Sequence, residues 1–262
     1  MKTLTKYLNE KLIIFPSQVD EKLVINKDYK YGNVYTCAPK TFNELRKIIE
    51  DRYNKFGPGT KDKPVDFNDV DVSNIDSFYN KTTNNGIFQQ TKFKYINISY
   101  WNVSNVENMS SMFVICHNLE SVGDLSDWNV SNVVFMDNMF SACKQLKSIG
   151  DLSDWDVSNV KDMTVMFSDC EQLKSIGDLS KWDVSNVEYM NYMFYRCEQL
   201  KSVGDLSKWD VSKVEYMTSM FESCKQLTSI GDLSNWNVSK VKCMGAMFYD
   251  SGITNIPDWY EW

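Results

Sequence analysis

The sequence has little histidine and proline, no long hydrophobic run and no excess of basic residues. It has one histidine, His117, and five prolines in 262 residues. No apolar run approaches the ~18–20 residues of a membrane-spanning helix, and the run at residues 12–15 is shorter than the roughly 7–15 residues of a secretory signal core. We therefore expect no membrane insertion and no Sec export. A cytoplasmic or virion-associated location is favoured over a Sec-exported one.

The charge and the cysteine pattern exclude two further classes of protein. A net charge of −7 and a pI near 4.9 lack the basic footprint that nucleic-acid binding requires. Seven cysteines are present, but no two have the CxxC spacing, and a single histidine cannot complete a zinc site with them. We expect no nucleic-acid partner, no cofactor and no bound metal.

What the sequence does have is a repeat of 27 residues, marked by tryptophan. The six tryptophans in this register are Trp101, Trp128, Trp155, Trp182, Trp209 and Trp236. A fixed period of this length is typical of a solenoid, in which each coil buries its apolar face only against its neighbours. Taking each tryptophan as position 0, we name the coils that begin there coil one to coil six.

Most apolar residues keep this period and are predicted to form the core. Valine recurs at positions 2 and 5, methionine at 8 and 11, and phenylalanine at 12. Position 15 carries the cysteine ladder of the first five coils, which is Cys116, Cys143, Cys170, Cys197 and Cys224. Adjacent coils would bring these thiols about 5 Å apart, so disulfides remain open on distance. We favour the interpretation that each is a small buried free thiol.

The fold class that we predict is an α/β repeat solenoid of the leucine-rich-repeat type. Positions 5, 8, 11, 12 and 15 follow helical spacing, with a serine at position 3 as helix cap. Positions 18–21 are the best strand candidate, and a Gly-Asp pair at positions 22 and 23 predicts a turn. Each coil is thus expected to contain a short strand, a Gly-Asp turn and a short helix, with the strands stacked into a parallel sheet.

The ends of the chain depart from the repeat and define the domains. Residues 1–65 do not repeat and are predicted to form an α+β N-terminal cap, with a helix that begins at the capping box Thr41-Phe42-Asn43-Glu44 and runs to about Asn54. Residues 66–250 form the solenoid, with a degenerate first coil at 66–100 that carries a net insertion of four within residues 80–90, and regular coils from 101. Residues 251–262 are a shortened C-terminal cap.

The repeated phrase W-[ND]-V-S-[NK]-V-x-x-M-x-x-M-F-x-x-C-x-x-L-x-S-[VI]-G-D-L-S resembles the BspA-like leucine-rich-repeat surface proteins, and most closely their mycoplasma-type branch, whose repeat domain has no assigned function. The resemblance covers roughly residues 66–257. It implies a bacterial or phage protein that is non-enzymatic, lies at a cell surface or is adhesive, and binds host proteins or other cells. Surface members usually carry an export signal, which we do not expect here, so a phage-encoded, virion-associated member is a further hypothesis.

Residues that differ between coils are the candidates for binding. They concentrate at positions 6, 7, 10, 13 and 14, where aromatic residues and one arginine gather around coils four and five. The candidate contact patch consists of Phe135, Tyr189, Tyr192, Tyr195, Arg196 and Tyr216, because tyrosine and arginine are enriched in interface hot spots. The competing interpretation is that these side chains are scattered on the surface or pack between neighbouring coils.

A second candidate is the acid at position 23 of the first five coils, namely Asp124, Asp151, Asp178, Asp205 and Asp232. Such a column could chelate calcium, but calcium needs six to eight oxygens and only one acid per coil is fixed. A Gly-Asp turn whose carboxylate accepts backbone N–H groups explains the column without an ion.

The sequence therefore predicts a non-enzymatic recognition or adhesion module for a protein or a cell-surface ligand. The alternatives are a structural scaffold, for example a virion component, and an intracellular scaffold for other proteins. Catalysis is the least supported class, since the serines repeat as caps and turns rather than beside a base, and His117 is not repeated. The oligomeric state stays open.

Overall fold

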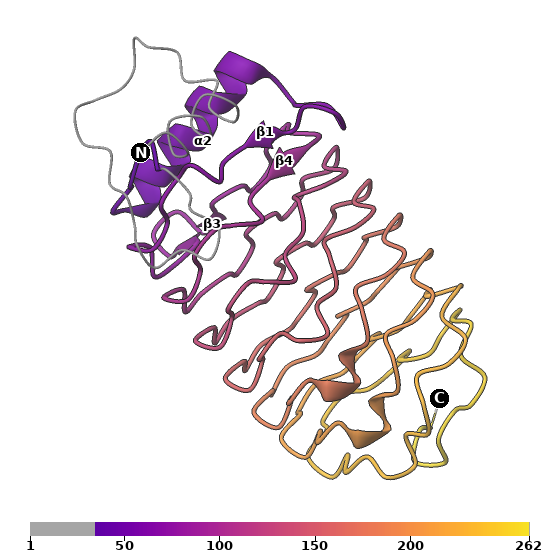
Figure 1. Ribbon diagram of the computed structural model, residues 1–262. Coiled ribbons are helices and arrows are strands. Elements are labelled where there is room, and N and C mark those ends of the chain that lie inside the picture. The colour runs from indigo at the N-terminus through magenta and orange to yellow at the C-terminus, as the bar shows by residue number, and fades with distance from the viewer. Residues whose placement is uncertain (1–34, 262) are drawn as a thin grey trace, which may run out of the picture.

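The computed structural model describes residues 35–261, so that what was expected of residues 1–34 lies outside the described residues. Stacked coils follow helix α2, which lies at one end of the stack, opposite the last coils (Figure 1). The named elements are α2 (Phe42–Phe56), β1 (Val65–Asp66), β2 (Tyr79–Asn80), β3 (Asn85–Gly86), β4 (Ile96–Asn97) and the 3-10 helices η2 (Leu179–Lys181) and η3 (Leu206–Lys208).

Helix α2 forms where the capping box predicted it. The Thr41 side chain accepts the Glu44 N–H at 3.2 Å, and the Glu44 carboxylate accepts the Lys40 N–H at 2.7 Å. The helix ends at Gly57, whose φ of 70° favours glycine, and the Gly57 N–H donates to Tyr53 O. Its apolar face buries Leu45 and Ile49 completely, which packs the helix onto the N-terminal end of the stack.

The coils lie side by side, in parallel and in register. Residues 27 apart at position 7 form β-bridges from coil one to coil six, and the 66–100 segment joins the same series through the bridge between Ser77 and Asn108. Within that segment β2 and β3 make an antiparallel hairpin, in the range where the sequence predicted the net insertion. Strand β1 pairs in parallel with β4, which attaches the N-terminal region to the stack.

The periodic residues form one continuous core. The phenylalanines at position 12 stack from coil to coil with ring centroids 5.2–6.1 Å apart. Each repeat tryptophan of coils two to six is buried, and its Nε1–H donates to the main-chain carbonyl 30 residues earlier, as from Trp182 to Leu152 O at 2.9 Å. The tryptophans therefore satisfy their polar atom inside the core.

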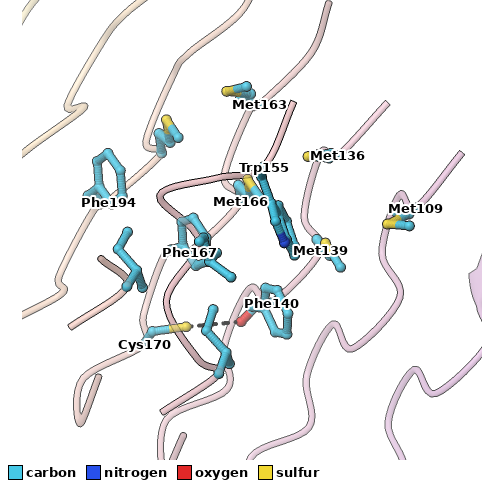
Figure 2. Close-up of a cluster of buried hydrophobic side chains, with 14 of the residues drawn as sticks. Met109, Met136, Met139, Phe140, Trp155, Met163, Met166, Phe167, Cys170 and Phe194 are labelled. Atoms are coloured by element: carbon cyan, nitrogen blue, oxygen red, sulfur yellow. Dashed lines mark hydrogen bonds between the residues drawn. The ribbon is translucent and has the colours of Figure 1, made fainter. Parts of the chain in front are cut away.

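The ladder cysteines are free thiols, each bonded to the preceding coil. Cys170 Sγ donates to Phe140 O at 3.2 Å, and the other four make the same contact at 3.0–3.1 Å (Figure 2). Burial raises the pKa of Cys170, Cys197 and Cys224, in the last case to about 12. These three thiols are thus held as neutral core groups.

The helix predicted at positions 5–15 is wrong, because this segment is a series of turns in all six regular coils. The residues at positions 10 and 14 have φ between 52° and 62°, which no α-helix accommodates. Met166 N–H donates to Met163 O three residues back, whereas the next N–H, of Phe167, donates to Met193 O in the following coil. The apolar spacing that suggested a helix is a spacing of three, because turns such as those from Met166 N–H to Met163 O and from Cys170 N–H to Phe167 O join apolar residues three apart.

The strand predicted at positions 18–21 is shorter than expected. In the described residues it appears as single bridges, from Tyr95 to Ser121 and from Ser121 to Ser148, not as a continuing sheet. The glycine at position 22 of coils one to five takes φ between 84° and 94°, so the chain bends before a strand can lengthen. The Gly-Asp turn itself is present, as the sequence predicted.

We expect Trp182→Ala to lower the free energy of unfolding by about 3–5 kcal/mol, because it removes a buried ring and the indole hydrogen bond to Leu152 O, which keeps only the Trp155 N–H as a donor. Denaturant unfolding measures the change. Lys181→Ala, at an exposed side chain next to it, is the control and should change it by less than about 0.5 kcal/mol. A loss below about 1 kcal/mol for Trp182→Ala would contradict the prediction.

Val165 holds the left-handed conformation at position 10 with φ 61°, which is costly for a β-branched residue. Asn138 occupies the same position one coil earlier with φ 57°. We therefore expect Val165→Asn to raise the free energy of unfolding by about 1 kcal/mol, and the reverse change Asn138→Val to lower it similarly. A melting or denaturant curve that orders the two variants the other way would refute this explanation.

Candidate binding surface

The residues at position 7 form a continuous stripe along the stack, because backbone bridges join them from coil to coil. The position-7 stripe is Asn108, Phe135, Asp162, Tyr189, Tyr216 and Cys243. It places three of the predicted contact residues, Phe135, Tyr189 and Tyr216, in one line. Asp162 lies between Phe135 and Tyr189, and burial raises its pKa.

Tyr189 and Tyr216 form a stacked pair within this stripe. Their ring centroids are 5.6 Å apart at an interplanar angle of 7°. The Lys242 ammonium lies 5.4 Å from the Tyr216 ring and 2.6 Å from a Glu215 carboxylate oxygen, and the hydrogen bond to Glu215 raises the pKa of Lys242. Both residues are half-buried on the outer surface. The pair therefore offers two stacked rings, with the Lys242 ammonium beside them, for contact with a ligand.

Tyr192, Tyr195 and Arg196 form a second group in coil four. The two tyrosine rings meet edge to face at 5.7 Å, and Tyr192 is 39% exposed. Arg196 contacts Asp169 at 3.2 Å and Glu171 at 3.9 Å. Both acids belong to coil three, so the ion pairs of Arg196 connect coil four to coil three.

The structure thus divides the predicted patch into two groups, and we find no ring contact joining them among the described residues. Phe135, at 40% exposure, is separated from the tyrosine pair by Asp162. The interpretation that neighbouring coils pack against each other through these side chains holds for Tyr189, Tyr216 and Arg196. Tyr192 and Phe135 are the exposed members.

Sequence reasoning missed two exposed groups at the C-terminal end of this face. Tyr249 occupies position 13 of coil six, as Tyr195 does in coil four, and is 59% exposed. Cys243 ends the position-7 stripe and is an exposed free thiol. Comparing the coils position by position contained the signal for both.

The acids at position 23 act as caps of the turn that follows them. Oδ1 of each accepts the N–H of the serine two residues on, at 2.9–3.1 Å. Such bonds lower the pKa of Asp151, Asp205 and Asp232. No group of three or more potential metal ligands is gathered within residues 35–261. The hydrogen bonds to the following serines give each acid of this column a structural role in its turn.

Another group that the sequence analysis missed surrounds Glu120. Its carboxylate contacts Lys147 Nζ at 2.5 Å, Tyr95 Oη at 2.5 Å and Lys94 Nζ at 2.9 Å. The Lys147 hydrogen bond, followed by those of Tyr95 and Lys94, lowers the pKa of Glu120 to about 2. Glu120 stands at position 19, where coils two to four have lysine, so comparison of the coils could have revealed it.

This cluster gives a pH prediction. A carboxyl group whose pKa is lowered by folding stabilises the folded state above its unfolded pKa of about 4.3, and that contribution is lost as the pH falls towards 2. We expect Glu120→Gln to lower the free energy of unfolding by about 1 kcal/mol at pH 7. The difference from the parent protein should shrink between about pH 4.3 and pH 2. Denaturant curves at several pH values measure it, and a difference that does not change with pH would contradict the ion-pair explanation.

Within the described residues, no helix is both long enough and apolar enough to cross a membrane.

Comparison with known proteins places the repeats in a family. The family model described as Mycoplasma protein of unknown function, DUF285, matches residues 81–202 and again residues 171–260. These two matches span most of the stack and confirm the resemblance to the mycoplasma-type repeat. No curated protein and no solved structure matches the chain. The chain therefore belongs to the DUF285 family, mycoplasma-type proteins of unknown function.

Proposed function

We propose that the chain is a repeat solenoid of the leucine-rich-repeat type that works as a non-enzymatic recognition or adhesion module. It binds a protein partner through the position-7 stripe and the neighbouring Tyr192 and Tyr195. The finer relationship to BspA-like surface proteins, and a phage-encoded origin, belong to the same proposal.

The observation that carries the proposal is the Tyr189–Tyr216 stack. Aromatic side chains at a protein interface give a large contact area at a small cost in conformational entropy, and here the stack already fixes both rings. Exposed aromatic neighbours, namely Phe135, Tyr192 and Tyr249, extend the same variable face. The core positions repeat almost unchanged while these positions differ, so specificity can vary without a cost to the scaffold.

The repeated serines, the ladder thiols and His117 are used by the fold, which supports the non-enzymatic part. The hydroxyls of Ser104, Ser131 and Ser158 at position 3 donate to the side chain at position 1, as Ser158 Oγ does to Asp156 Oδ1 at 2.6 Å. The ladder thiols lie in the core against main-chain carbonyls. His117 Nδ1 lies 3.0 Å from Ala142 O.

A comparative pull-down tests the proposal. The purified protein and the variant Tyr189→Ser/Tyr192→Ser/Tyr195→Ser are immobilised and exposed to a cell-envelope extract, with Lys181→Ala as the matched control. We expect one partner to be retained by the parent protein and the control and lost, by about tenfold or more, from the triple variant. Thermal stability should change little, since these rings lie outside the core.

A large drop in melting temperature in the triple variant would show that the tyrosines serve the stability of the stack rather than partner binding, and would overturn the assignment. Stoichiometric co-purification with a larger particle, unaffected by the variant, would favour the structural role.

A further inference from the structure

The two ends of the stack are closed to different degrees. At the N-terminal end, the carbonyls of Ile87 and Gln89 have no earlier coil to pair with. Arg46 of helix α2 fills that role: its Nη1 donates to Ile87 O at 2.7 Å and to Gln89 O at 3.4 Å. The bridge between Cys37 and Val70 covers the neighbouring backbone. This end is therefore sealed.

At the C-terminal end, the residues after coil six cover one half of that coil. The Tyr260 ring packs 5.0 Å from Phe248, and the Tyr260 hydroxyl accepts the Met247 N–H at 3.1 Å. Trp259 stacks on Trp236 at 6.2 Å. Trp236, Met247 and Phe248 are accordingly buried.

The other half of coil six is open. Val238, Val241 and Met244 are only partly buried, whereas Val211, Val214 and Met217 at the same positions of coil five are at most 1% exposed. We call residues 238–246 the open edge. Apolar side chains that every earlier coil buries are here in contact with solvent, as far as residues 35–261 show.

The backbone of the open edge is unpaired in the same way. In coil five, Met217 N–H donates to Cys243 O at 2.9 Å and Ser219 N–H to Gly245 O at 3.0 Å. The equivalent N–H groups of coil six, on Met244 and Ala246, meet no acceptor among the described residues. A row of free donors beside an apolar strip is a template for another backbone.

We propose that the open edge binds an extended segment of a partner polypeptide by backbone pairing. The segment runs parallel to coil six and carries apolar side chains at every third residue, as coil five does against coil four. The edge repeats the donors and the apolar positions of the five internal junctions, so the chemistry that fits those junctions fits here. This site goes beyond the proposed function, because it uses residues 238–246 rather than the tyrosines.

A second copy of the chain fits less well. Parallel pairing needs the N-terminal side of a coil, and in this chain Arg46, helix α2 and residues 36–37 occupy that side. Two open edges could meet only with their chains antiparallel, which none of the junctions between regular coils uses. The partner must therefore provide an extended segment whose backbone carbonyls are free to accept these N–H groups.

A peptide with the sequence of residues 209–222 is the probe, because it supplies Val211, Val214 and Met217 without a cysteine. Fluorescence anisotropy of the labelled peptide measures binding to the full protein. We expect saturable binding that weakens at least about tenfold in Val241→Lys/Met244→Lys, and equally for a peptide with Val214→Lys and Met217→Lys. Tyr189→Ser should bind the peptide as the parent does, which separates this site from the tyrosine surface.

Hydrogen exchange supplies the second readout. We expect the peptide to slow exchange of the Met244 and Ala246 amides, while the Met217 amide, already bonded, does not change. If the double lysine variant fails to fold, Met244→Gln takes its place with a smaller loss of binding. The proposal is overturned if there is no saturable binding, if the variants bind equally well, or if the two amides become protected without peptide as the protein concentration rises, which would identify a second copy as the occupant.

Discussion

Each coil depends on its neighbour for half of the N–H groups in its central segment. From position 10 to position 15 of coil three the donors alternate, one reaching a carbonyl of the following coil and the next closing a turn three residues back, as Phe167 and Met166 do. An isolated coil would leave every second donor unpaired, and a buried unpaired N–H is costly. This alternation explains why the coils must stack, why they stack at a fixed register, and why the ends need special treatment.

The alternation also explains where sequence reasoning succeeded and where it failed. The core positions, the helix that begins after Thr41 and the Gly-Asp turns were predictable, because burial, a capping box and glycine leave direct marks in a sequence. The turns at positions 8–15 were not, since a period of three resembles 3.6 over so short a segment. Left-handed conformations at Val165 and Ile115 leave no mark at all, because no single-residue preference points to them.

The candidate surface was predictable in part. The position-7 residues could be recognised as variable, but their alignment into a stripe follows from backbone bridges that the helical interpretation did not contain. Glu120 was visible as one acid in a column of lysines, whereas its contact with Tyr95 depends on the irregular 66–100 segment. The hydrogen bond from Arg46 to Ile87 O joins residues far apart in sequence, and no local sequence pattern predicts it.

Arg46 and helix α2 cover the N-terminal end of the stack, so the two ends differ in their resistance to local unfolding. In a protein whose repeats contact only their neighbours, opening starts at the repeat with the fewest bonds and spreads one repeat at a time. Coil six, half covered, is that repeat, whereas the first coil is held by a guanidinium and a packed helix. We therefore expect unfolding to begin at coil six and to proceed towards helix α2. Tyr216 and Tyr189, in coils five and four, lie on the coils that would open next.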